Sequence, residues 1–266
     1  NKFDIFNSID TTVSDYWIKL DEANGIFTGS SGDEEFNYED VYVNSLTGSD
    51  EGTGDESNPF KTISRAFSDG FGREGDPLII HLSEGVYDTY SGEVFPIQLP
   101  SYISLIGAGS GLTIINANET SNVFYLDNVS GCSLEGLTIT GGNGENTVMF
   151  GAGGGLIGIG SSFSFDDVNV TSNQTNTYGS GIFLKDCNVV LSNVVVENNS
   201  LPLLGGGLFI WNSNFMMDQS VIRGNHGNGG GIYLKDCNYE ISNSEIYNNL
   251  SICLKRPIDA GFNSLK

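Results

Sequence analysis

The sequence is poor in basic side chains, with 11 Lys and Arg against 33 Asp and Glu and a formal net charge of −22 at pH 7. A chain this acidic repels the phosphate backbone, so nucleic acid is excluded as a favoured partner. An apolar run long enough to cross a membrane is also absent, and we therefore expect no membrane span. The acidity is greatest before Lys61, where many Asp and Glu side chains accompany only Lys2 and Lys19.

The chain does contain an internal repeat. The segment from Gly229 reads GGGIYLKDCNYEISNSEIYNN and the segment from Gly179 reads GSGIFLKDCNVVLSNVVVENN, with 12 of 21 positions identical. Further copies begin at Gly153 and Gly205, so the four starting glycines recur with a nearly constant period in the mid-twenties. A fixed period of this length indicates a solenoid whose units stack on their neighbours.

Each repeat unit predicts three short strands, because apolar and polar residues alternate in three runs separated by Gly or Asn. Leucine-rich repeats have a similar length but need a Leu-rich skeleton and usually a helical segment, and neither is present. The pattern therefore favours a parallel β-helix whose coils lie about 4.8 Å apart. Three inward columns follow from the alignment: Leu156, Ile182, Leu208 and Ile232; Phe163, Val189, Phe215 and Tyr239; and Val170, Val196, Ile222 and Ile246.

Asparagine and glycine recur at the expected corners of the coils. Two Asn columns follow from the alignment: Asn173, Asn199, Asn225 and Asn249, and Asn188, Asn214 and Asn238. Asn tolerates left-handed backbone and hydrogen-bonds its neighbours, so stacked turns favour it. The 36 glycines suit tight corners where a Cβ atom would clash.

These residues carry a family resemblance. The GGGL, GGGI and ENN elements are similar to repeats of polymorphic outer-membrane proteins, and the plan resembles the right-handed parallel β-helix proteins of the pectate-lyase-like superfamily. The segment VYVNSLTGSDEGTGDESNPFKTISRAF, Val41 to Phe67, resembles the start of secreted β-helix proteins, some of them polysaccharide lyases. The resemblance implies a right-handed coil, which the bias of parallel connections also favours, and an extracellular or cell-surface location.

We therefore predict an all-β chain, a single-stranded parallel β-helix of six to seven coils with an N-terminal cap. Residues 1–40 form an acidic extension or linker, and residues 41–77 supply a strand, an acidic loop and a capping helix. Residues 78–250 form the β-helix, and residues 251–266 form an irregular tail. The tail either folds over the last coil or leads into further chain. We expect a monomer.

The aligned columns argue against a disulfide between Cys187 and Cys237, two of the four cysteines. They occupy the same place two coils apart, with Ser213 between them, so their Cα atoms lie roughly 9.6 Å apart. A disulfide allows about 7 Å.

The loop Gly48 to Ser57 has four carboxylates that suggest calcium: Asp50, Glu51, Asp55 and Glu56. Their spacing matches neither an EF-hand nor the Gly-rich nonapeptide repeat of calcium-binding β-rolls. A solvated acidic turn is the simpler interpretation. We thus expect no cofactor, with calcium as the alternative.

The outward rows hold the candidate binding residues. Strict alternation turns Phe183, Phe209 and Tyr233 outward in one row, after Ile157, and Lys185, Trp211 and Lys235 in the next. Sugar rings stack on aromatic faces, and lysines attract uronic or sulfated sugars. The row is therefore either a platform for a polysaccharide or cell-surface glycan, or a stripe that another segment covers.

Candidate catalytic residues are scattered along the sequence and form no clear cluster. Lyases of this superfamily need a base, commonly with calcium, and the repeats offer Arg223, Glu197 one coil before it, and His226. A surface ion pair between Glu197 and Arg223 is the simpler account, and His81 is more often a packed histidine than a base. The sequence therefore favours a secreted or cell-surface protein that binds polysaccharide or a partner surface without catalysis. The alternative is a polysaccharide lyase or glycoside hydrolase acting on acidic polysaccharides.

Overall fold

The structure, a computed structural model, describes residues 18–21, 26–29, 40–68, 72–144, 152–250 and 261–262. The chain divides into two compact units, Asn1–Glu39 and Asp40–Lys266. The first unit contains an antiparallel hairpin of β1 (Ile18–Asp21) and β2 (Ile26–Gly29). The division falls at the end of the acidic extension that the sequence predicts. Other residues of that extension lie outside the described part.

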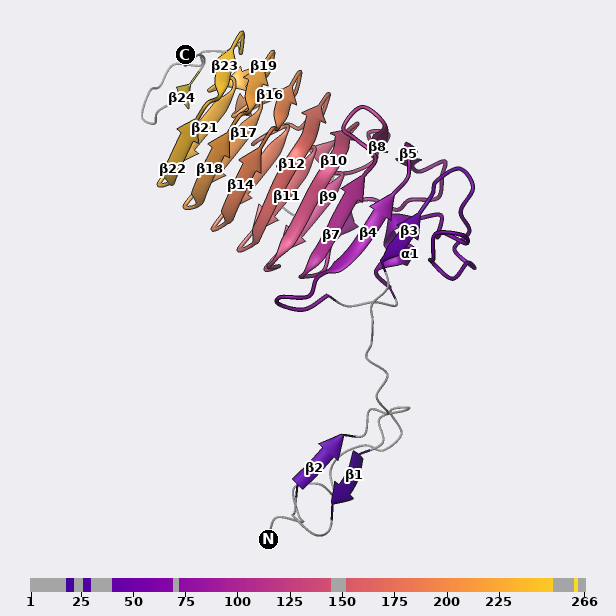
Figure 1. Cartoon of the computed structure of the whole chain (residues 1–266). Helices are drawn as coiled ribbons and strands as arrows, with labels where there is room; N and C mark the ends of the chain where they lie inside the picture. The colour runs from indigo at the N-terminus through magenta and orange to yellow at the C-terminus, as the bar shows by residue number, and fades with distance from the viewer. Residues whose placement is uncertain are drawn as a thin grey trace. The chain divides into compact units, whose positions relative to one another are not determined.

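The second unit is a right-handed, single-stranded parallel β-helix of about six turns, and Figure 1 shows its coils stacked from β3 to β23. The first face consists of β3 (Val41–Val43), β4 (Leu78–Leu82), β7 (Ile103–Gly107), β10 (Cys132–Thr140), β12 (Ser162–Thr171), β14 (Asn188–Ser192), β18 (Asn214–Asp218) and β22 (Asn238–Ser242). The second consists of β6 (Ile97–Gln98), β9 (Phe124–Asp127), β11 (Leu156–Ile159), β13 (Ile182–Lys185), β17 (Leu208–Trp211) and β21 (Ile232–Lys235), and β24 (Gly261–Phe262) pairs antiparallel to β21.

The third face consists of β5 (Gly85–Asp88), β8 (Thr113–Asn116), the second halves of β10 and β12, β15 (Val195–Glu197), β19 (Val221–Arg223) and β23 (Glu245–Tyr247). A short pair, β16 (Ser200–Leu204) and β20 (His226–Asn228), lies in the turns that lead to the second face. Apart from β24, the strand pairs of the β-helix are parallel. The all-β prediction is confirmed.

The predicted inward columns lie in register and fill the core. Leu156, Ile182, Leu208 and Ile232 are aligned and buried, as are Val170, Val196, Ile222 and Ile246. The prediction is wrong for Tyr239, the last member of its column, which is 52% exposed. Its strand β22 lies at the end of the stack, so neighbouring coils cover this ring from one side only.

The column of Asn173, Asn199, Asn225 and Asn249 forms a buried hydrogen-bond ladder. The Oδ1 atom of Asn199 accepts from both the backbone N and the Nδ2 of Asn173, each at 3.0 Å. The Nδ2 of Asn199 also donates to the carbonyl of Val170 at 2.9 Å. Left-handed backbone is not the reason for these asparagines: the positive φ lies one residue earlier, at Ser172, Asn198, Gly224 and Asn248. Asn is needed because it joins one coil to the next.

A glycine column makes room for this ladder. A Cβ atom on Gly181 would lie 2.5 Å from the carbonyl oxygen of Gly207 and 3.1 Å from the Nδ2 of Asn199. Gly155 and Gly207 meet equivalent atoms on their own neighbours, and a Cβ atom on Gly231, in the last coil, would lie 2.7 Å from the Nδ2 of Asn249. At Gly155, Gly181 and Gly207 glycine is therefore required by close approach of the next coil, since backbone this near excludes any side chain.

The N-terminal end of the core is closed by α1 (Ile63–Ala66). Ile63 and Ala66 are buried in the core cluster, and Phe67 packs against it, which confirms the predicted cap. Thr62 caps the start of the helix, and its hydroxyl accepts from the Arg65 backbone N–H at 3.2 Å. The described part of the chain has no helix long and apolar enough to cross a membrane.

Three cysteines, Cys132, Cys187 and Cys237, are free thiols. The predicted absence of a Cys187–Cys237 disulfide is thus confirmed. Ser213 stands between them and its hydroxyl accepts from the Cys187 backbone N–H at 3.0 Å. Cys253 and most of the tail 251–266 lie outside the described residues.

Candidate functional site: an aromatic cleft on the second face

The two predicted outward rows lie in register on three neighbouring strands. β13, β17 and β21 align Phe183 with Phe209 and Tyr233, and two positions later Lys185 with Trp211 and Lys235. The alternation of each strand places both rows on the outer side of the second face. The predicted register of these two rows is therefore confirmed.

Of the two alternatives, an exposed platform or a covered stripe, the covered stripe applies to two of the rings. Phe183 and Phe209 are 4% and 5% exposed and form a second apolar cluster outside the main core. Their planes are 6° apart with centroids at 5.5 Å, and Phe209 stacks on Tyr233 in the same way at 5.1 Å. Each ring face is therefore covered by the next ring, so a sugar cannot stack on these faces in succession.

The residues that cover the rings lie in the turns between coils. Tyr178, Leu204 and Ala152 belong to the same cluster, and the ring of Tyr178 lies 5.0 Å from that of Phe209. The sequence analysis missed them because they fall between the strand-like runs. A signal was present, since each of the three directly precedes a repeat glycine and they recur with the period of the repeat.

Trp211 lies between the two lysines of its row. The Nζ atoms of Lys185 and Lys235 lie 5.3 Å and 4.8 Å from its ring centroid, which is cation–π geometry. Lys185 also pairs with Asp186 at 2.7 Å, and its ammonium lowers the pKa of that carboxyl. For Lys235, no carboxylate partner occurs among the described residues.

All six predicted binding residues line one cavity of about 380 Å³, together with Ala152, Tyr178 and Leu204. Among its lining residues the two phenylalanines are buried, and Tyr178, Trp211 and Tyr233 are half-buried. We call this site the aromatic cleft. It can bind an extended molecule that has apolar faces and negative or hydroxyl groups.

The candidate catalytic residues are held in surface contacts. Arg223 Nε donates to Glu197 Oε2 at 2.7 Å and its Nη1 donates to the Tyr247 hydroxyl at 3.2 Å. These hydrogen bonds, first that to Tyr247, raise the pKa of Arg223 further above its ordinary range, so the neutral form that could accept a proton becomes still scarcer. His226 is exposed on β20, and its backbone N–H donates to the carbonyl of Asn199 at 2.9 Å. The ion pair expected from the sequence is present.

The four acidic candidates of the loop 48–57 point to different partners. Asp50 accepts from the backbone N–H of Lys61 and of Thr62, both at 2.9 Å. Asp55 accepts from the hydroxyl of Ser57 and from other groups of its own turn, which lowers its pKa to about 2. Glu51 and Glu56 are exposed. Within the described ranges no three His, Cys, Asp or Glu side chains converge as a metal site.

The structure also has a polar pocket that the sequence analysis missed. It contains Glu56 and His81, and the Nε2 of His81 lies 2.8 Å from Asp40 Oδ2. His81 and Asp40 lie far apart in the non-repetitive part of the chain, so no spacing pattern joins them.

Solved structures with a similar course of chain include the pectin methylesterase PemA from Erwinia chrysanthemi, with 12% identity and a TM-score of 0.37 over 76% of this chain and 66% of that one. The pectin methylesterase from carrot has 15% identity and a TM-score of 0.37 over 77% of this chain and 82% of that one. The A-module of the mannuronan C-5 epimerase AlgE6 from Azotobacter vinelandii has 19% identity and a TM-score of 0.41 over 64% of this chain and 61% of that one. At these values the similarities assign no activity to the chain.

Comparison with curated proteins gives no match. A family model does match residues 46–258, from the acidic loop through the last coil, and its description reads "Protein of unknown function (DUF1565)". The match covers the α1 cap, the aromatic cleft and the strands from β4 to β23. The chain is therefore a member of the DUF1565 family.

Proposed function

We propose that this chain is a secreted or cell-surface protein that binds an acidic polysaccharide in the aromatic cleft without chemical turnover. The observation that carries the proposal is that three successive coils place Lys185, Trp211, Tyr233 and Lys235 around one cavity that Phe183 and Phe209 also line. Natural carbohydrate ligands combine apolar ring faces with polar edges, and this lining offers a surface for each.

The contacts differ from those of a stacking platform. Because the faces of Phe183 and Phe209 are covered, a sugar would meet the half-buried Tyr178, Trp211 and Tyr233. Aromatic contacts contribute on the order of 1 kcal/mol each, so a few of them give a micromolar to millimolar site.

Lys235 gives the site its preference for acidic sugars. Its ammonium lies over Trp211 and has no carboxylate partner among the described residues. A uronate carboxylate would pair with it. That part of the affinity should fall as salt rises, because mobile ions screen exposed charges.

The test is titration of galacturonate and mannuronate hexasaccharides, and of a neutral hexasaccharide, into the parent chain and into Trp211→Ala and Lys235→Ala. Met216→Ala is the matched control, since Met216 is exposed on β18 of the neighbouring face. We expect Trp211→Ala to weaken all binding severalfold and Lys235→Ala to weaken only uronate binding. Equal binding by the parent and both cleft variants contradicts the proposal.

Catalysis is tested in the same samples. A lyase forms an unsaturated product that absorbs in the ultraviolet, and a hydrolase forms new reducing ends. We expect neither product, with or without calcium. Either product, lost in Arg223→Ala or Glu197→Gln, would replace the binding proposal by the lyase or hydrolase alternative.

A further inference from the structure

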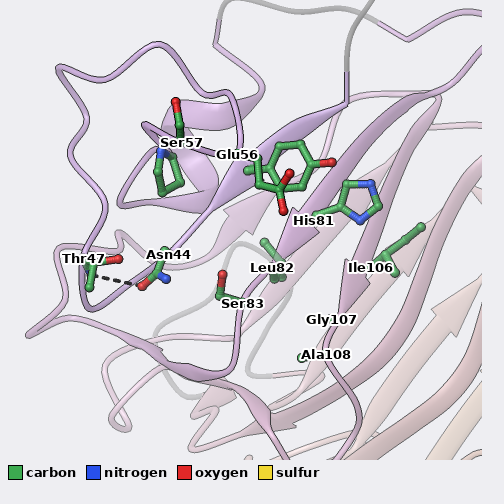
Figure 2. Close-up of a pocket in the computed structure, with 12 residues that line it drawn as sticks. Asn44, Thr47, Glu56, Ser57, His81, Leu82, Ser83, Ile106, Gly107 and Ala108 are labelled. Atoms are coloured by element: carbon green, nitrogen blue, oxygen red, sulfur yellow. Dashed lines mark hydrogen bonds between the residues drawn. The ribbon is translucent and has the colours of Figure 1, made fainter.

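The polar pocket lies at the N-terminal end of the first face, far in sequence from the aromatic cleft. Its floor is formed by β3, β4 and β7, which align Tyr42 with His81 and His81 with Ile106. Thr47 lines the pocket together with Glu56 and Ser57 of the acidic loop, and the volume of the pocket is about 510 Å³. Figure 2 shows Thr47 and Ser57 on one side, with His81 and Ile106 on the other.

His81 is held in one orientation by two contacts. Its ring stacks on Tyr42 with centroids 5.0 Å apart and planes at 23°, and Nε2 lies 2.8 Å from the Asp40 carboxylate. Because the carboxylate accepts a hydrogen bond from Nε2, the Nδ1 atom of the neutral ring is an acceptor. No described residue donates a hydrogen bond to this Nδ1.

The wall of the pocket is fixed before any ligand arrives. The Oδ1 of Asn44 accepts from the backbone N–H of Leu46 and of Thr47, both at 3.0 Å, and Figure 2 marks the second bond. Asp55 accepts from the Ser57 backbone N–H at 2.8 Å and from that of Asn58 at 3.0 Å. A preformed wall lowers the entropy lost on binding.

The pocket is rich in acceptors and poor in cations. No Lys or Arg is among its lining residues, and the Glu56 carboxylate makes no ion pair or hydrogen bond with the described residues. The described side chains also form no metal-binding group of three. The complementary ligand is therefore an organic molecule with several donors, of which an ammonium group supplies three.

We propose that this pocket binds a sugar unit that carries a protonated amine. Glu56 pairs with the ammonium group, and His81 Nδ1 accepts from a sugar hydroxyl. Thr47 and Ser83 line the same pocket, and their hydroxyls form hydrogen bonds with the remaining hydroxyl groups of the sugar. The ligand is opposite in charge to the one proposed for the aromatic cleft, and the two sites are independent.

The test is titration of a glucosamine tetrasaccharide, and of its fully N-acetylated form, into the whole chain. The variants are Glu56→Gln, His81→Gln and Glu51→Gln. The last is the matched control, because Glu51 is an exposed carboxylate of the same loop outside the pocket lining. The net charge of −22 attracts any polycation, and the control measures that general attraction.

We expect Glu56→Gln to weaken binding of the amine form about tenfold, the value of one charge-assisted hydrogen bond. His81→Gln should weaken it severalfold, Glu51→Gln should leave it nearly unchanged, and the acetylated form should bind less tightly. Equal losses in Glu56→Gln and Glu51→Gln overturn the proposal, as does tighter binding of the acetylated form. Binding of trilysine, but not of the sugar, with the same dependence on Glu56 would assign the pocket to a basic peptide instead.

Discussion

Glu93 should make the stability of the β-helix depend on pH near neutrality. Its side chain is 3% exposed beside the capping helix, where the carboxylate accepts from the Ile63 backbone N–H and, at 3.2 Å, from the Ser64 hydroxyl. Burial raises the pKa of Glu93 from its ordinary 4.5 to about 7, and the nearby charge of Asp50 adds to the effect. The hydrogen bonds act in the opposite direction but do not cancel it.

The sign follows from proton binding in the two states. Between pH 4.5 and about 7 the folded chain holds a proton on Glu93 that the unfolded chain has lost. The free energy of unfolding therefore decreases with rising pH across this window, by about 1.4 kcal/mol per pH unit at most. From the two pKa values of 4.5 and about 7, the whole effect is about 3 kcal/mol.

The perturbation is Glu93→Gln, which keeps an acceptor for Ile63 and removes the charge. The variant should be more stable than the parent at pH 8 by up to about 3 kcal/mol, and the difference should vanish near pH 4. Urea unfolding followed by circular dichroism at pH 4, 5, 6, 7 and 8 measures this. Glu84→Gln, an exposed carboxylate, is the control. Parallel pH profiles of the Glu93→Gln variant and the parent would refute the reasoning.

Two substitutions and one labelling experiment test the packing of the coils. Asn199→Ala should lower the free energy of unfolding by about 3 kcal/mol, because it leaves buried partners on both neighbouring coils unsatisfied; the exposed Asn188→Ala is its control, and equal urea midpoints would contradict the ladder. Gly181→Ala should destabilise through overlap with Gly207, whereas Gly111→Ala, which meets nothing within 4 Å, should be neutral in thermal unfolding. Burial raises the pKa of the Cys187 thiol, so it should react with a disulfide reagent only after denaturant is added, and rapid reaction in the native state would refute its burial.

The repeating part of the fold could be predicted from the sequence because each coil is related to the next by translation. Alignment of Ile182 with Leu208 and Ile232 in the sequence is the same as alignment in space. The sequence predicts that Asn199 lies at a corner of the coil, but it does not give the reason for the asparagine. Asn198 and Asn199 are adjacent, and only the structure shows that the positive φ belongs to Asn198. Alternation likewise tells which way Phe209 points, and it does not tell what covers the ring.

The non-repeating part could not be predicted in this way. The contact between His81 and Asp40 depends on the path of a loop and a cap that occur once in the chain. The burial of Glu93 depends on the same cap, and composition would place a glutamate on the surface. Sites built from unrepeated segments therefore need the structure.

The ladder of Asn173, Asn199, Asn225 and Asn249 also makes whole coils interchangeable. Each asparagine bonds to its counterpart one coil away with the same pair of atoms. Duplication or loss of one whole repeat unit would thus leave every remaining bond with an equivalent partner. The same event would lengthen or shorten the aromatic cleft by one residue in each row. The length of the ligand proposed for the aromatic cleft can therefore change by duplication of one repeat unit, without redesign of the core.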